Sequence, residues 1–273
     1  MTPTASPAFT RQLWNKVPEV TIFFWIIKVL ATTVGETAGD LLSTRLGLGL
    51  TNTLIVMSVV TIAVLVWQVM TKRYAPAPYW LSVVLISVVG TLITDYLHDN
   101  LGISFEVTTS VFTVILAAVF AIWYAFEHTL SIHSIITTRR ELFYWSAILF
   151  TFALGTSAGD QAAESLNFGY GPSAIIFAQA IAAVTAVFYI LKSVSRLQPH
   201  SPASIWCFWI AYILTRPLGA SVGDYLAKPH IAGGWGLGTL YTSELFLVLI
   251  SALVVFLTAT RIDRQEAADP QAA

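Results

Sequence analysis

The pattern W-x9-G-x3-[GT]-D occurs four times in the chain, each time without an insertion or deletion. Its tryptophans are Trp25, Trp80, Trp145 and Trp209. Its closing segments are GETAGD, GTLITD, GTSAGD and GASVGD, at residues 35–40, 90–95, 155–160 and 219–224. Four matches at a fixed spacing indicate an internal repeat. The fold must therefore place four related segments in related environments.

Each repeat predicts a pair of membrane-spanning helices. The chain is 56% hydrophobic and only 11% charged, whereas soluble domains carry about 25% charged residues. Apolar stretches of about 20 residues, long enough to cross a bilayer, lie at 20–41, 52–71, 78–97, 107–127, 141–163, 173–191, 204–226 and 241–260. We predict an all-α integral membrane protein with eight spans, in which the motif-bearing first helices of the four pairs form an inner bundle.

These spans predict a single membrane domain at 19–260, with repeats near 19–72, 74–128, 139–193 and 202–260. The polar segment 1–18 and the tail 261–273 are expected to lie outside this domain, the tail being disordered.

The lysines and arginines predict the orientation. With an even number of spans, one side of the membrane collects Arg11, Lys16, Lys72, Arg73, Arg139, Arg140, Lys192, Arg196, Arg261 and Arg264, and the other only Arg45 and Lys228. Cytoplasmic loops are rich in lysine and arginine, so both termini are predicted to be cytoplasmic. The four repeats are then parallel, and the four aspartates share one level, roughly 22 Å beyond the tryptophans at 1.5 Å per residue.

The repeated glycines admit two interpretations. They are Gly35 and Gly39, Gly90, Gly155 and Gly159, and Gly219 and Gly223, with Thr94 replacing the second glycine of the second repeat. Small residues four apart allow membrane helices to approach closely, which favours helix packing. Alternatively, the glycines expose backbone carbonyls to a cation beside the aspartate.

The four aspartates, Asp40, Asp95, Asp160 and Asp224, are the predicted ion-binding residues, together with Glu36. A carboxylate within a membrane usually faces the interior of the helix bundle, and oxygen ligands suit hard cations such as Mg²⁺, Mn²⁺ or Ca²⁺. A metal site at Asp40, Asp160 and Asp224 is one hypothesis. The alternative is that each aspartate ends its helix at the outer interface and caps the following turn.

Lys28, Glu36 and Arg216 break the four-fold symmetry, because the other repeats have uncharged residues at these positions. We expect Lys28 and Arg216 to form gating or structural ion pairs, such as Glu36–Lys28 and Asp160–Arg216. For Lys28, snorkelling to the cytoplasmic side is the alternative.

The four motif tryptophans each have another aromatic residue beside them, in FFW, YW, FYW and FW. This pattern is typical of an aromatic belt at the membrane interface, so we interpret Trp25, Trp80, Trp145 and Trp209 as interface anchors.

Four tandem two-span repeats with this motif resemble a bacterial inner-membrane family described only as a repeat of unknown function. The stretches KVPEVTIFFWIIKVLATTVGETAGD and LTRPLGASVGDYL carry the likeness most clearly, and it covers residues 16–260. The resemblance implies eight helices and a bacterial cytoplasmic membrane. It implies no substrate.

Signatures of known enzyme classes are absent from the sequence, so we expect no enzymatic activity and no cofactor. A basic surface for nucleic acid is also lacking, and the expected partners are the lipid bilayer and a small cation or proton, with an oligomer possible. The leading hypothesis is a secondary transporter or exporter of a cation, such as Mn²⁺, that uses the intramembrane carboxylates. The alternatives are a cation channel and a non-transporting membrane component whose charges are structural ion pairs.

Overall fold

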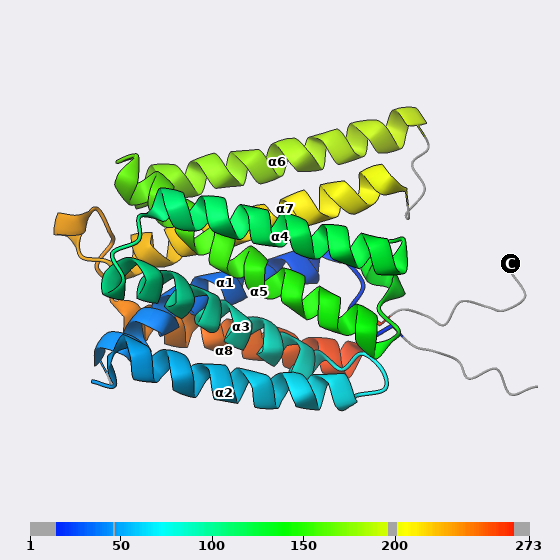
Figure 1. The fold of residues 1–273 in the computed structure, drawn as a ribbon, viewed down its shortest axis with the longest axis horizontal. Coiled ribbons are helices and arrows are strands. Elements are labelled where there is room, and N and C mark those ends of the chain that lie inside the picture. Colours follow the sequence, from blue (N-terminus) through cyan, green and yellow to red (C-terminus); the bar gives the residue numbers. More distant parts are fainter. Residues whose placement is uncertain (1–14, 46, 196–200, 265–273) are drawn as a thin grey trace, which may run out of the picture.

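The computed structural model describes residues 15–45, 47–195 and 201–264 (Figure 1). In this part of the chain there are eight long helices and no strand. The helices are α1 (Ile22–Asp40), α2 (Gly49–Met70), α3 (Pro76–Asp95), α4 (Phe105–Glu127), α5 (Thr138–Asp160), α6 (Tyr170–Ser195), α7 (Pro202–Ala227) and α8 (Thr239–Thr260). All eight are long and apolar enough to cross a membrane, which confirms the predicted multi-pass helical fold.

Several helices begin at residues suited to that position. Thr21, Thr137 and Ser201 precede α1, α5 and α7, and each side chain accepts a hydrogen bond from the backbone N–H three residues later. Such caps satisfy donors that a helix leaves unpaired at its start. Pro76 and Pro202 occupy the first turns of α3 and α7, where proline costs no hydrogen bond.

The motif-bearing helices form a closed inner ring. α1 packs against α3, α3 against α5, α5 against α7, and α7 against α1. In these four helices, 50–67% of an 18-residue apolar stretch is buried inside the protein, compared with at most 28% in the other four helices. The predicted inner bundle of motif helices is therefore confirmed.

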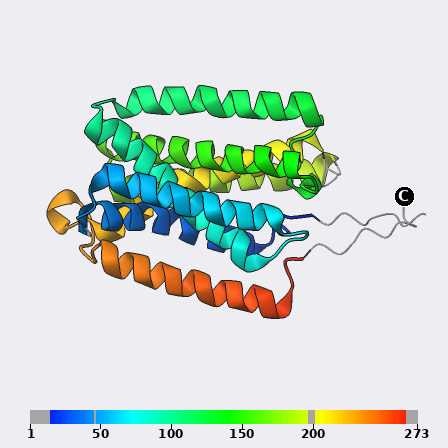
Figure 2. The ribbon, with the colours of Figure 1, turned by 60° about the horizontal axis from the view of Figure 1, so that its bottom comes forward.

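The second helix of each repeat packs outside the ring, against the motif helix of the next repeat. α2 packs on α3, α4 on α5, α6 on α7, and α8 closes the circle on α1. Figure 1 shows α6 and α2 on opposite sides of the molecule, and Figure 2, turned by 60°, shows α4 and α8 at top and bottom. All four repeats run in the same direction, so the four aspartates lie at one end of the ring.

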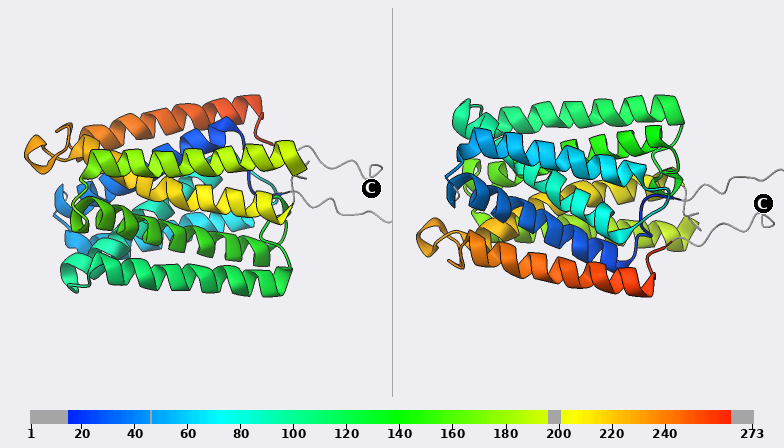
Figure 3. Two further views of the ribbon diagram at one scale, coloured as in Figure 1. Left: turned by 90° about the horizontal axis from the view of Figure 1, so that it is seen from above. Right: turned by 90° about the horizontal axis from the view of Figure 1, so that it is seen from below.

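Both ends of the described chain lie at the other end of the bundle (Figure 3). Glu19 N–H donates to the carbonyl of Asp263 at 2.9 Å, and Tyr74 OH donates to the Asp263 carboxylate at 2.5 Å. The pKa of this carboxyl is raised by burial, an effect that its hydrogen bonds and Arg264 only partly offset.

Packed residues lie beyond both of the predicted domain boundaries. Val17 is buried, and Lys16 pairs with the buried Glu141 of α5 at 2.6 Å. The packed region therefore begins before residue 19 and continues past residue 260 to Asp263. The remainder of the segment 1–18 and of the tail, residues 1–14 and 265–273, lies outside the described residues, as do Leu46 and Arg196.

Candidate functional site

One contact repeats around the inner ring. We call the first glycine of each G-x3-[GT]-D segment the leading glycine. Each leading glycine faces a residue on the inner helix of the next repeat, and this residue lies three positions before that helix's own leading glycine. The pairs are Gly35 with Ser87, Gly90 with Phe152, Gly155 with Arg216, and Gly219 with Thr32. A Cβ on any of these glycines would lie 1.9–2.9 Å from its neighbour, so only glycine permits this approach. The packing interpretation of the glycines is confirmed.

Thr94, which replaces a glycine in the second repeat, also serves the helix interface. Its hydroxyl donates to the carbonyl of Gly90 in its own helix and to that of Ala153 in α5, each at 3.2 Å. Hydroxyl groups commonly make such hydrogen bonds across membrane helix interfaces. The departure from the pattern therefore replaces a glycine contact with a hydrogen bond.

Three buried carboxylates meet inside the ring at its aspartate end. Glu36 of α1, Asp160 of α5 and Asp224 of α7 are 4%, 7% and 3% exposed. Each offers an oxygen, and these oxygens lie within 4.8 Å of one another. We call these three residues the carboxylate triad. The geometry could hold a metal ion, because all three ligand atoms could reach one centre.

The predicted metal set named Asp40 where the structure places Glu36. Asp40 and Asp95 are only half-buried. Glu36 lies one turn deeper than Asp40 and has a longer side chain, so its carboxylate reaches the triad. Glu36 also interacts electrostatically with all four aspartates. The triad is thus the most deeply buried part of a five-carboxylate cluster.

The capping alternative for the aspartates is not supported at two of them. The side chains of Asp95 and Asp160 make no capping hydrogen bond. A five-residue π-helical turn follows the aspartate in the first three repeats: η1 (Leu41–Arg45), η2 (Tyr96–Asn100) and η4 (Gln161–Ser165). Such turns are frequent at functional sites. No pattern in the sequence predicts them.

Arg216 is fully buried and reaches from α7 to α1. One guanidinium nitrogen lies 2.9 Å from Glu36 Oε2, and another donates to the carbonyl of Thr32 at 3.1 Å. The nitrogen that contacts Glu36 also donates to the hydroxyl of Thr91. The suggested Asp160–Arg216 pair is therefore wrong, because α7 packs directly against α1 and this brings the guanidinium to Glu36.

Lys28 is also fully buried, and its amine has no hydrogen-bond partner among the described residues. The nitrogen lies 4.1 Å from the ring centroids of both Phe152 and Tyr212, a cation–π geometry. Both alternatives for Lys28, a Glu36–Lys28 pair and snorkelling to the surface, are therefore wrong. Inner helices surround the side chain on all sides, and the carboxylate of Glu36 pairs with Arg216 instead.

Aromatic side chains fill the ring toward the chain termini. Trp80, Trp145 and Trp209 are 1%, 5% and 0% exposed, and Trp25 is half-buried. The hydroxyls of the buried Tyr79 and Tyr144 lie 2.5 Å apart. The interpretation of the tryptophans as interface anchors is wrong for the three buried ones, because these side chains pack between the inner helices rather than facing lipid.

Lys228, the residue after α7, lies at the outer edge of the triad. Its ammonium is 3.4 Å from Asp224 Oδ1, 3.4 Å from Glu164 Oε1 and 3.1 Å from the hydroxyl of Tyr170. Lys228 is not among the site residues predicted from the sequence. Its spacing of four residues from Asp224 could have indicated the pair, since residues four apart on a helix are neighbours.

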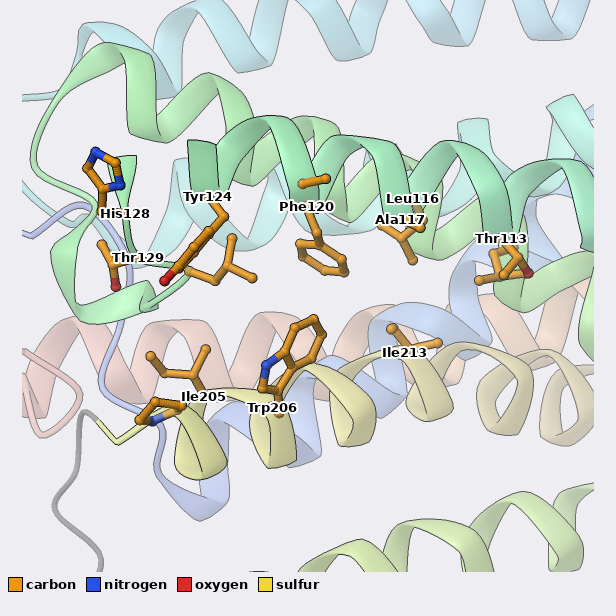
Figure 4. A pocket seen from close by; sticks show the side chains of 14 residues that line it. Thr113, Leu116, Ala117, Phe120, Tyr124, His128, Thr129, Ile205, Trp206 and Ile213 are labelled. Carbon is orange, nitrogen blue, oxygen red and sulfur yellow. The ribbon is translucent and has the colours of Figure 1, made fainter. Parts of the chain in front are cut away.

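Two grooves of the described structure lie outside the inner ring. One, of about 730 Å³, separates α4 from α7, and Figure 4 shows Phe120, Tyr124 and Trp206 along it. The other, of about 860 Å³, lies among α1, α6 and α7. Their walls are mainly apolar, and neither contains a residue of the carboxylate cluster.

Comparison with known proteins agrees with the repeat. No curated protein and no solved structure matches the chain. The model of one family, described as "Repeat of Unknown Function (DUF347)", matches residues 23–74, 78–129, 143–193 and 207–263. These four segments cover most of the sequence, and each spans most of one motif helix and of the helix that follows it. The chain therefore belongs to this repeat family.

Proposed function

We propose that the protein is a secondary transporter that exports a cation, with a divalent metal such as Mn²⁺ as its cargo. The carboxylate triad carries this proposal, because three of the four inner helices each contribute one buried carboxylate to it. Carboxylate oxygens are the ligands that hard divalent cations prefer. Buried carboxylates in a membrane are costly and usually mark an ion or proton pathway.

The surrounding charges suit a site that must release its cargo. Asp40 and Asp95 are half-buried, so they would offer carboxylates to the cation between the triad and water. Arg216 holds Glu36 and would compete with the cation for it. Lys28 interacts electrostatically with Arg216. When it is protonated, its positive charge would also oppose the binding of a cation. Protons or the membrane potential would drive the cycle.

The buried side chains favour a transporter over a channel. Arg216, Lys28, Tyr79 and Tyr144 fill the inner ring on the side of the triad toward the chain termini. A permanently open pore would need a water-filled path there. A transporter needs access from one side at a time, and the closed aromatic layer suits such a cycle.

A non-transporting membrane component is the second candidate, and the Glu36–Arg216 pair is the observation that favours it. A buried pair of this kind can be purely structural. Asp160 separates the two candidates, because its carboxylate has no ion-pair or hydrogen-bond partner among the described residues. A purely structural role for the charges does not explain why this unpaired carboxylate is buried.

We further propose that the protein lies in a bacterial cytoplasmic membrane with both termini in the cytoplasm. The excess of lysine and arginine at the end of the bundle that holds the termini supports this orientation. The triad would then lie in the outer half of the membrane, where a cation leaving the cell would be released.

Cellular metal content tests the proposal. A deletion strain would be compared with strains that express the wild type, Asp160→Asn or Asp99→Asn, each challenged with a panel of divalent metals and analysed by mass spectrometry. We expect one metal to accumulate in the deletion strain and with Asp160→Asn, and to fall with the wild type. The exposed Asp99 provides the matched control. Equal metal content in all strains would argue for the non-transporting role.

A further inference from the structure

Lys228 differs from the other charged residues near the triad in how it is attached. It follows the last residue of α7 and opens the loop that leads to α8. Its carbonyl accepts a hydrogen bond from Gly236 N–H at 2.9 Å, and a Cβ on Gly234 would lie 2.0 Å from the same carbonyl. The loop therefore holds the backbone of Lys228 in place. Motion of this residue is left to its side chain.

The ammonium of Lys228 has partners on two sides of the site. It contacts Asp224, the triad member on its own helix, and Glu164, which lies in the turn after α5. It also donates to Tyr170 OH and lies 4.7 Å from the centroid of that ring. These contacts connect α7 to the beginning of α6 at the aspartate end of the ring.

Lysine is charged at neutral pH, and the ammonium of Lys228 lies 3.4 Å from the carboxylates of both Asp224 and Glu164. The side chain is 31% exposed, whereas that of Asp224 is 4% exposed. The ammonium can therefore exchange Asp224 for water by a change of rotamer, which Arg216, fully buried, cannot do.

The triad thus has two tethered cations, one on each side. Arg216 neutralises Glu36 on the side of the chain termini, and Lys228 neutralises Asp224 on the outer side. Asp160 has no cationic partner among the described residues. A metal ion that used all three carboxylates would compete with Lys228 for the negative charge of Asp224.

We propose that Lys228 is a tethered competitor of the transported cation: its ammonium occupies Asp224 when the site is empty and must leave Asp224 when a cation binds the triad. This inference rests on the proposed function, since it assigns a residue that sets the affinity of the same site. Release of the cargo would be assisted from the outer side, because the returning ammonium displaces the cation from Asp224.

Equilibrium binding of Mn²⁺ to the purified full-length protein in detergent tests this inference. We expect Lys228→Gln to bind Mn²⁺ about two- to fivefold more tightly than the wild type, as expected for the loss of a partly exposed ion pair. Lys228→Arg retains the charge and should bind like the wild type. Lys192→Gln removes one positive charge from an exposed position near the other end of the bundle, and it should leave the affinity unchanged.

A second background shows whether the effect passes through Asp224. In Asp224→Asn protein, which should bind more weakly, adding Lys228→Gln should no longer increase the affinity. If the wild type binds Mn²⁺ and Lys228→Gln binds it equally or more weakly, the role proposed for Lys228 is overturned and the proposed Mn²⁺ site is not. A wild type without saturable Mn²⁺ binding would instead overturn the proposed Mn²⁺ site and this inference with it. Melting temperatures of all variants show that each is folded.

Discussion

Arg216 and Lys28 are both fully buried among the inner helices, yet only Arg216 has a carboxylate beside it. The amine of Lys28 has two aromatic rings and no hydrogen-bond partner among the described residues. A buried polar group without a partner is costly, whereas its replacement by an apolar group of similar shape can be stabilising. The two residues should therefore respond in opposite ways to substitution.

Lys28→Met should raise the thermal stability of the protein in detergent, by about 1 kcal/mol. Methionine is one heavy atom shorter than lysine, and its apolar end suits the rings of Phe152 and Tyr212, which face the amine of Lys28. Lys192→Met, at an exposed position, is the matched control and should have little effect. A melting temperature clearly below that of the wild type would show that Lys28 has a stabilising partner. If Lys28 serves transport, the stabilised variant should lose activity, because functional residues often reduce stability.

Glu36→Gln should destabilise the protein by about 3 kcal/mol, because it leaves the guanidinium of Arg216 buried without its carboxylate. Combining it with Arg216→Met should restore most of the lost stability, since both charges are then removed. Thermal melts of the two single variants and the double variant form the cycle that measures this coupling. Additive losses in the double variant would mean that the two side chains do not act as a pair.

At this scale the sequence predicts which residues matter better than it predicts their partners. The repeat places Asp160 and Asp224 at one depth and Glu36 one helical turn deeper, and the break in symmetry singles out Lys28 and Arg216. The alignment of repeats gives depth along the membrane but not the direction of each side chain. The Glu36–Arg216 pair and the place of Lys228 both depend on how α7 meets its neighbours, so neither followed from the sequence.

At the scale of the elements, the glycines determine how closely the inner helices approach. The space beside them differs from one glycine to the next. A Cβ would lie 1.9 Å from the nearest atom at Gly35, 3.1 Å at Gly39 and 3.4 Å at Gly159. The first distance requires the helices to move apart, and the last is an ordinary van der Waals contact.

Alanine substitutions should follow this order. Gly35→Ala should cost about 1–3 kcal/mol, typical of overpacking, Gly39→Ala less, and Gly159→Ala least. Alanine also has the better helix propensity, so the last variant is expected to be neutral or slightly stabilised. Thermal melts in detergent measure the series. Equal losses at Gly35 and Gly159 would contradict the packing role assigned to the leading glycine.

Hydropathy predicted the long helices well, because crossing a bilayer fixes their length. The predicted span 107–127, for example, corresponds to α4 at Phe105–Glu127. The π-helical turns after Asp40, Asp95 and Asp160 could not be predicted in this way. They depend on hydrogen bonds between residues five apart, which have no simple pattern of apolar positions.

At the scale of the whole molecule, the ring has no unique starting point. α7 and α8 of the last repeat pack against α1 of the first, just as each earlier repeat packs against the next. The ends of the described chain meet at one end of the bundle through Glu19 and Asp263. The repeat made the inner bundle predictable, but the circular closure is a property of the folded molecule.

A circular permutant should therefore insert and fold. Its old ends would be joined by a flexible linker and new ends opened between Lys72 and Arg73, which are exposed between α2 and α3. The order of repeats becomes second, third, fourth, first, and each still enters the membrane from the same side. Monodisperse elution in detergent with a melting temperature near that of the wild type is the expected result. Aggregation would indicate that the first repeat must be made first.

The central claim is that the carboxylate triad binds the transported cation, and flux measured in proteoliposomes tests it most directly. Purified wild type, Asp160→Asn and Asp99→Asn would be reconstituted in parallel, and Mn²⁺ movement followed with a trapped indicator. Asp160 makes no ion pair or hydrogen bond among the described residues, so its substitution removes a ligand without breaking a contact. We predict saturable flux for the wild type and Asp99→Asn and none for Asp160→Asn. Equal flux with Asp160→Asn would contradict the account.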